Sequence, residues 1–249
     1  MPEGPSIVIL REEVAHFTGQ VIRRARGNAK IDMDRLPGQT VRAFRSFGKQ
    51  TLIELPDALA IRIHLLMFGS YRVDDPKEAA PRLQLDFDNG ELAFYSCSVR
   101  LLEGELDDLY DWRGDVMSPT WSPALALQKL RTNPTMLVCD ALLDQTIFAG
   151  VGNIMKNEVL YRIRVHPLSQ VGALSAYKLA QMVRQARVYA FEFLAWKKAY
   201  VLRKHWLVHN QSRCPRHDIP LSRAYLGVSN RRTFFCVRCQ KLYRLDSST

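Results

Sequence analysis

Four potential metal ligands lie close together in the C-terminal part of the chain. They form two pairs, Cys214 with His217 and Cys236 with Cys239, with two residues inside each pair and 18 between the pairs. This spacing lets both side chains of a pair converge on one ion from a tight turn, and three thiolates with one imidazole favour tetrahedral zinc. We therefore expect one structural Zn²⁺ here, since four protein ligands leave no open position for catalysis.

A second chemical feature lies at the other end of the chain, where Pro2 and Glu3 follow a methionine. Removal of that methionine would leave Pro2 with a free secondary amine. An α-amino group titrates near pH 8, so much more of it is a neutral nucleophile at pH 7 than of a lysine side chain. Such an amine can attack a sugar C1′ and form an iminium, which is Schiff-base catalysis. The pair alone does not specify a reaction, because many chains begin this way.

Four segments, in this order, resemble motifs of the formamidopyrimidine-DNA glycosylase and endonuclease VIII family. Residues 2–5 resemble its catalytic N-terminus, and residues 47–55 resemble the strand that presents a phosphate-binding lysine. Residues 148–154 with Glu158 resemble its helix-two-turn-helix motif, and residues 231–236 resemble its zinc hairpin. The resemblance covers the whole chain and implies an α+β fold. An N-terminal helix plus a β-sandwich domain would precede a C-terminal helical helix-two-turn-helix domain with a zinc-finger hairpin.

The resemblance also implies a role for individual residues. Pro2 would be the nucleophile, and Glu3 would be the general acid that protonates the deoxyribose ring oxygen as the base leaves. Lys49, beside them in the catalytic set, would grip a phosphate near the lesion, as would Asn153 and Arg231. The glycines before Asn153 would let backbone amides approach that phosphate at a helix start.

Removing a base from a duplex requires rotating its nucleotide out of the stack, and an apolar side chain must then fill the vacancy. The segment 64–72 resembles the family's void-filling loop, so Leu66, Met67 and Phe68 are the candidate wedge residues. The alternative is that these three side chains belong to the core of a strand. Glu158 completes the set of residues expected at the DNA-binding surface.

Three departures from the family pattern bear on catalysis or on the substrate. Ser6 stands where the family has a glutamate of the catalytic surroundings, which affects how Pro2 is positioned. The region 194–213 lacks the Gly- and Thr-rich loop that encloses 8-oxoguanine, and the region 95–100 lacks the Arg and Phe pair inserted opposite the lesion. These absences favour the endonuclease VIII side of the family. The implied activity is a bifunctional glycosylase and abasic-site lyase of base excision repair that removes oxidised pyrimidines and cuts the strand by β,δ-elimination.

Charge is distributed unevenly along the 249 residues. Residues 1–118 hold 15 Lys and Arg against 19 Asp and Glu, whereas residues 119–249 hold 20 against 6. An excess of basic charge in one half indicates a polyanionic partner, and damaged DNA fits better than an anionic membrane because we find no basic amphipathic helix with an aromatic face. We expect a monomer that needs no small-molecule cofactor.

No secretory signal is recognisable, so we expect an intracellular protein, cytoplasmic and nucleoid-associated when it acts on DNA. Its thiols would then be reduced, and Cys97 and Cys139 would be buried as small apolar side chains.

The elements that must position these residues follow from periodicity. A helix is expected over Ile7–Phe17, and short apolar runs separated by turn residues predict strands over 51–55, 59–64, 69–73, 83–87 and 92–95. Helical spacing returns over 124–131, 136–143, 154–161 and 175–196. We therefore expect a catalytic β-sandwich domain over 1–118, a linker over 119–123, a helix-two-turn-helix domain over 124–209 and a zinc finger over 210–249.

Two other functions remain open at this point. A zinc-ribbon protein could bind damaged DNA without catalysing a reaction. Ser6, which replaces the family's glutamate, is compatible with this hypothesis. An RNA-binding or ribosome-associated factor would explain the basic half but not the proline start. Borohydride trapping distinguishes the proposed enzyme from these two alternatives, because only a Schiff base is reduced to a stable protein–DNA adduct.

Overall fold

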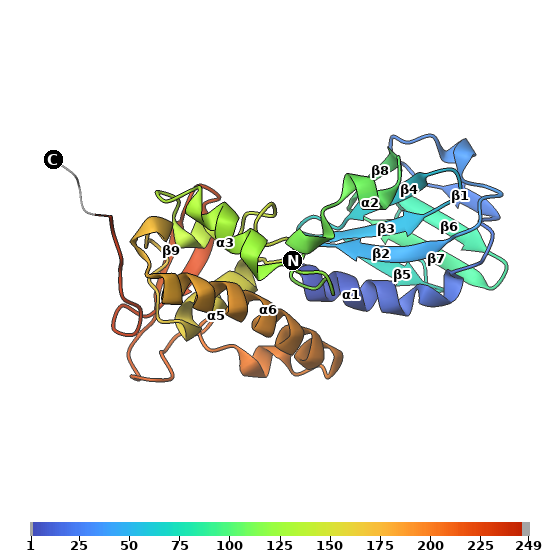
Figure 1. Ribbon diagram of the computed structural model, residues 1–249. Helices are drawn as coiled ribbons and strands as arrows, with labels where there is room; N and C mark the ends of the chain where they lie inside the picture. Colours follow the sequence, from blue (N-terminus) through green and yellow to red (C-terminus); the bar gives the residue numbers. More distant parts are fainter. Residues whose placement is uncertain (1, 246–249) are drawn as a thin grey trace. The chain divides into compact units, whose positions relative to one another are not determined.

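The computed structural model describes residues 2–245, and the chain divides into two compact units, residues 1–112 and 113–249 (Figure 1). The division falls after Trp112, whereas we expected the first domain to extend to residue 118. The expected linker belongs to the second unit, where Ser122 caps the first long helix by accepting a hydrogen bond from the Leu125 amide at 3.2 Å. The expected zinc finger also belongs to this unit, because its hairpin packs against one of the helices.

The first unit is a β-sandwich preceded by helix α1 (Gly4–Glu13). One antiparallel sheet has the strand order β1-β6-β7-β5, and the other has the order β2-β3-β4-β8. The strands are β1 (Arg24–Arg26), β2 (Ala43–Phe47), β3 (Gln50–Glu54), β4 (Leu59–His64), β5 (Ser70–Val73), β6 (Leu83–Phe87), β7 (Gly90–Tyr95) and β8 (Ser98–Glu103). Side chains such as Ile53, Ile61, Leu85 and Phe94 from both sheets join in one buried core. The sandwich expected from the sequence is thus confirmed.

Helix α1 and the turn that follows it bury one side in the sandwich core, as the apolar spacing in the sequence predicts. Ile7, Leu10, Val14 and Phe17 are fully buried in the sandwich core, at spacings that bring them to one face. The helix begins three residues earlier than we expected because Pro5 lies in its first turn, where the fixed φ of proline suits a helix and its missing amide proton costs nothing. It ends at Glu13, and the continuation is the 3₁₀ turn η1 (Ala15–Phe17).

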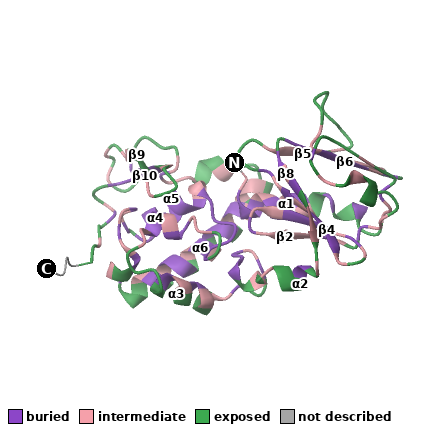
Figure 2. Ribbon diagram, turned by 90° about the horizontal axis from the view of Figure 1, so that it is seen from above, coloured by how far each residue is buried: buried purple, intermediate pink, exposed green. Residues whose placement is uncertain are grey.

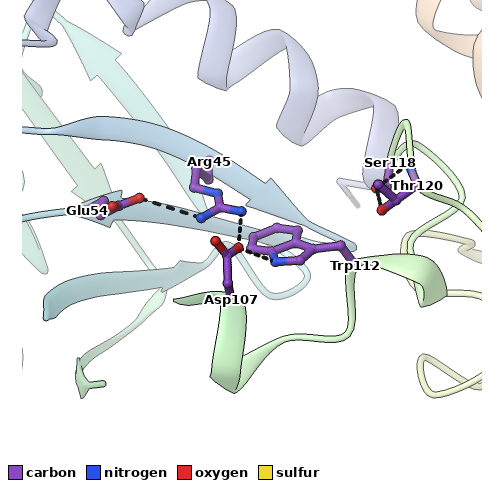
Figure 3. Close-up of polar contacts among 6 residues, drawn as sticks. All are labelled: Arg45, Glu54, Asp107, Trp112, Ser118 and Thr120. Atoms are coloured by element: carbon purple, nitrogen blue, oxygen red, sulfur yellow. Dashed lines mark hydrogen bonds and ion pairs between the residues drawn. The ribbon is translucent and has the colours of Figure 1, made fainter. Parts of the chain in front are cut away.

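The outer face of the second sheet is covered at the end of this unit by the short helix α2 (Leu106–Leu109). Arg45 on β2 holds that end in place, with its guanidinium 2.6 Å from Asp107 and 3.9 Å above the Trp112 ring (Figure 3). The indole nitrogen of Trp112 donates to the same Asp107 oxygen at 2.7 Å. Because apolar groups cover both faces of β3, its central residues 51–53 are all buried rather than alternating.

The second unit is helical with a terminal β-hairpin. Its helices are α3 (Pro123–Arg131), α4 (Val138–Ala141), α5 (Asn153–Arg162) and α6 (Ala176–Lys198), with the 3₁₀ turns η4 (Val171–Ala173) and η5 (Leu202–His205). The 3₁₀ turn η3 (Trp112–Gly114) spans the boundary between the two units. The hairpin consists of β9 (Ser222–Leu226) and β10 (Arg231–Phe235). Helix α5 is enclosed, with every residue from Met155 to Tyr161 buried (Figure 2). Within residues 2–245, no helix is both long and apolar enough to span a membrane.

Candidate active site and nucleic-acid interface

Pro2 and Glu3 immediately precede α1, and the helix fixes their backbone. Glu3 is the N-cap residue in an extended conformation, and its carbonyl oxygen accepts a hydrogen bond from the Ser6 amide at 2.8 Å. The Glu3 side chain is fully buried, whereas Pro2 remains partly exposed. After removal of Met1, Pro2 would carry a free amine directly before the buried Glu3, a pair that would suit acid-assisted nucleophilic chemistry.

Lys49 lies in the two-residue turn between β2 and β3, rather than within the strand itself. Gly48 precedes it with φ +56°, a left-handed conformation that glycine adopts without steric cost. His64 stands on the neighbouring strand opposite Gln50, and burial, followed by the charges of Lys49 and Arg62, lowers its pKa. His64 is therefore neutral near pH 7, and Lys49 provides a positive charge at this partly exposed turn.

The three candidate wedge residues form the tip of the turn between β4 and β5. Leu66, Met67 and Phe68 are 49%, 46% and 83% exposed, so they are not part of the strand core. Gly69 is required for this turn, because a Cβ there would lie 2.0 Å from the carbonyl oxygen of Leu65. Large exposed apolar side chains at a tight turn are the kind that insert between bases.

The start of α5 joins the helical part of the second unit to its hairpin. Gly150 has φ +98°, Gly152 is the N-cap residue, and Asn153 is the first residue of the helix. The side-chain amide nitrogen of Asn153 donates to the Arg232 carbonyl oxygen at 2.9 Å. Its carbonyl oxygen, Oδ1, is buried without a hydrogen-bond partner in the described structure. Asn153 therefore lies beside the strand that begins with Arg231.

Lys156, one turn further along α5, was not anticipated from the sequence. Its side chain is fully buried, and its Nζ donates to Thr233 Oγ1 at 2.7 Å. The Thr233 hydroxyl in turn donates to the carbonyl oxygen of Arg231 at 2.9 Å. This chain of bonds fixes the backbone at Arg231, whose side chain is partly exposed. Its place in the sequence, among other polar residues of the same helix, carried no signal of burial.

Glu158 has a different role from the DNA contact that we expected. Its carboxylate is fully buried and accepts hydrogen bonds from three successive backbone amides, those of Leu207 at 3.0 Å, Val208 at 3.0 Å and His209 at 2.7 Å. A buried group of this kind is not available to a ligand, so the expectation was wrong. Burial raises the pKa of Glu158, and the three amides oppose that effect.

The segment after α6 is fixed by this carboxylate and by a second contact from α5. The Asn157 amide nitrogen lies 2.9 Å from Nδ1 of His209, and burial, together with the nearby charge of Lys156, lowers the pKa of His209 to about 4. A neutral imidazole can accept this hydrogen bond. Residues 207–209 of the connection between α6 and Cys214 are therefore held to α5.

The four predicted metal ligands converge. Their ligand atoms all lie within 4.8 Å of one another, with Cys214 Sγ 3.5 Å from Cys239 Sγ and His217 Nδ1 3.2 Å from Cys239 Sγ. The Cys239 amide donates to Cys236 Sγ at 3.4 Å, and Tyr161 on α5 places its hydroxyl 3.2 Å from Cys214 Sγ. Donors to the sulfurs stabilise thiolates, and this donor set fits a closed tetrahedral zinc site.

The remaining two cysteines are buried, as we expected. Burial raises the pKa of both Cys97 and Cys139 to about 11, so neither thiol is a nucleophile near neutral pH.

Comparison with known proteins agrees with this arrangement. Residues 1–100 match the formamidopyrimidine-DNA glycosylase N-terminal domain, and residues 115–191 match the formamidopyrimidine-DNA glycosylase H2TH domain. The chain is 28% identical to Endonuclease 8-like 3 of Xenopus laevis over 92% of its own length and 39% of that protein. It is 27% identical to the formamidopyrimidine-DNA glycosylase of Chloroflexus aggregans over 97% of its length and 99% of that protein.

The fold is likewise that of solved members of this group. The structure of the Lactococcus lactis formamidopyrimidine-DNA glycosylase bound to DNA containing an abasic site superposes with a TM-score of 0.83, at 22% identity, over 96% of this chain and 99% of that one. The chain spans between 32% and 39% of the length of the Endonuclease 8-like 3 proteins that it matches. The two matched domains, the zinc-ligand cluster and the shared fold together show that this chain belongs to the formamidopyrimidine-DNA glycosylase and endonuclease VIII family.

Proposed function

We propose that the protein is a bifunctional DNA glycosylase and abasic-site lyase of base excision repair that acts on oxidised bases. The observation that carries this proposal is the pairing of the accessible Pro2 with the fully buried Glu3 at the start of α1. Family membership makes damaged DNA the expected substrate class, and the basic second half of the chain suits a polyanion.

The proposed reaction begins with the free amine of Pro2 attacking C1′ of the damaged nucleotide, as the glycosidic bond to the base breaks. Glu3 protonates the ring oxygen, the bond between that oxygen and C1′ opens, and the Pro2 nitrogen is left in an iminium. Loss of a proton from C2′ then expels the 3′ phosphate, and a second elimination expels the 5′ phosphate. Hydrolysis of the iminium returns the free amine.

Oxidised pyrimidines are the proposed lesion class. The region 194–213 lacks the Gly- and Thr-rich sequence of the loop that encloses 8-oxoguanine, and Glu158 holds residues 207–209 within it. Leu66, Met67 and Phe68 would fill the space left by the flipped nucleotide.

Borohydride trapping on DNA with an abasic site tests the proposed chemistry. Protein lacking Met1 should form a stable covalent adduct, because the reductant fixes the iminium. Pro2→Gly should lose most lyase activity, and a retained extension before Pro2 should prevent trapping. Efficient trapping by the extended protein would show that Pro2 is not the nucleophile.

One observation favours a second candidate, a damage-binding protein without catalysis. Ser6 in the first turn of α1 cannot supply the carboxylate that the family pattern has at this position. Binding to damaged DNA without any trapped adduct would support this alternative.

A further inference from the structure

The zinc hairpin has a second basic face, separate from the one that carries Arg231. In the β9–β10 register Arg232 pairs with Tyr225 and Phe234 pairs with Arg223, so these four side chains share one face. Arg231 and Thr233 alternate onto the other face, where Thr233 meets Lys156. The phosphate contact that the family resemblance implies for Arg231 therefore does not involve the side chains of this second face.

The side chains on this face present positive charge and an aromatic ring to solvent. Arg223 and Arg232 are exposed, and neither is paired with a carboxylate in residues 2–245. Tyr225 is 67% exposed, whereas Phe234 is buried against the zinc cluster with the Arg232 guanidinium 5.1 Å from its ring. Two cations beside an exposed aromatic ring are suited to binding a nucleic acid strand. The cations can bind its phosphates, and the ring can stack on a base.

A pocket of about 260 Å³ lies beside these arginines. Arg223 and Arg232 line it together with Asn210, Gln211 and Ser212, and Phe234 lines its apolar part. Amide and hydroxyl side chains add hydrogen-bond donors that match phosphate oxygens. The pocket is also held in place, because Glu158 fixes the preceding residues 207–209 and Asn153 fixes the backbone of Arg232.

We propose that this face is a second DNA-binding site, in which Arg223 and Arg232 each hold a backbone phosphate and Tyr225 stacks on a base of a single-stranded segment. The proposal rests on DNA being the substrate. It extends the interface to a part of the strand that neither the catalytic residues nor Arg231 contact, and it requires no lesion.

Binding of the full chain to an undamaged, single-stranded oligothymidine, measured over a series of salt concentrations, tests this site. The double variant Arg223→Ala, Arg232→Ala should lower the magnitude of the slope of log K against log salt by about 1.4, since each phosphate contact on a single strand contributes about 0.7. The matched control is Arg131→Ala with Arg184→Ala, which removes two exposed charges from α3 and α6 of the same unit. This control should retain the parent slope.

The aromatic contribution is tested separately. Tyr225→Leu should weaken oligothymidine binding about tenfold, whereas Tyr225→Phe, which keeps the ring, should bind as the parent does. If the Arg223→Ala, Arg232→Ala variant keeps the parent slope, or if the Arg131→Ala, Arg184→Ala control loses as much slope, the proposal is overturned. Tyr225→Leu binding as well as Tyr225→Phe would remove the stacking role.

Zinc content is measured for every variant, because one zinc per chain indicates an intact hairpin. If the double alanine variant loses zinc, Arg223→Gln and Arg232→Gln are tested singly, each with an expected change of about 0.7 in slope. Failure of the proposed chemistry would appear instead as absent borohydride trapping, which this binding assay does not involve.

Discussion

Glu3 has a defined structural position, and we propose a chemical role for it. Its backbone caps α1, and its side chain is fully buried directly after the partly exposed Pro2. This position next to Pro2 in the chain is the basis for proposing Glu3 as the general acid.

Replacing Glu3 with Gln should separate acid catalysis from binding. The amide keeps the shape of the side chain but has no titratable proton, so release of an oxidised pyrimidine should fall by about 10²–10⁴-fold. Affinity for DNA that already contains an abasic site should change little, and this measurement is the control. Base release at the parent rate would remove Glu3 from the proposed mechanism.

At the scale of elements, α5 organises the second unit. Its first turn binds the hairpin through Asn153 and Lys156, and its last turn reaches the zinc ligands through Tyr161. Between these, Glu158 holds the segment that follows α6. One buried helix thus holds in place the hairpin residues of the second unit that are proposed to bind DNA.

Glu158→Gln should destabilise this arrangement. A glutamine presents a single acceptor oxygen and an NH₂ group, so at least one of the three amides of residues 207–209 would be buried without a partner. The free energy of unfolding should fall by about 1–3 kcal/mol, measured by urea denaturation. Glu105→Gln, at an exposed position in the first unit, is the control and should leave it unchanged. Equal stability of both variants would contradict the anchoring role.

The zinc hairpin can be tested as an element in the same way. Cys236→Ser should release about one zinc per chain and disorder β9 and β10, because structural zinc supplies much of the folding free energy of such a small cluster. Metal analysis with circular dichroism measures both effects. The β-sandwich should remain folded, since it has its own core in residues 1–112. If metal analysis of the unsubstituted protein finds no zinc, the proposed zinc site is excluded.

At the scale of the whole molecule, candidate phosphate ligands occur in both units. Lys49 lies in the first unit, and Asn153 and Arg231 lie in the second, which also carries most of the net positive charge. A DNA substrate bound by all three would be gripped by both halves of the chain.

Salt titrations on lesion-containing duplex DNA should distinguish these three contacts. Lys49→Ala and Arg231→Ala should each flatten the slope of log K against log salt by about 0.9, because each would remove one neutralised phosphate. Asn153→Ala should weaken binding with almost no change in slope, since its amide carries no charge. An Arg231→Ala protein with the parent slope would show that this arginine does not contact a phosphate.

Local patterns in the sequence determined a large part of this protein. The cluster of three cysteines and one histidine follows from spacing within two short turns, and the strands around Ile53, Ile61 and Leu85 follow from their apolar runs. The start of α5 follows from the glycines that precede Asn153. In each case the information lies within a few neighbouring residues, where steric and hydrophobic preferences act directly.

The tertiary structure alone decided the roles of the buried polar residues and of the hairpin's second face. Glu158 finds its amide partners 49 to 51 residues away, and Lys156 finds Thr233 77 residues away. Helical periodicity states only that such a side chain lies on a given face of its helix. Which group it meets there depends on how distant segments pack. Because a charged side chain can face either solvent or a buried partner, only the fold distinguishes a DNA contact from a structural anchor.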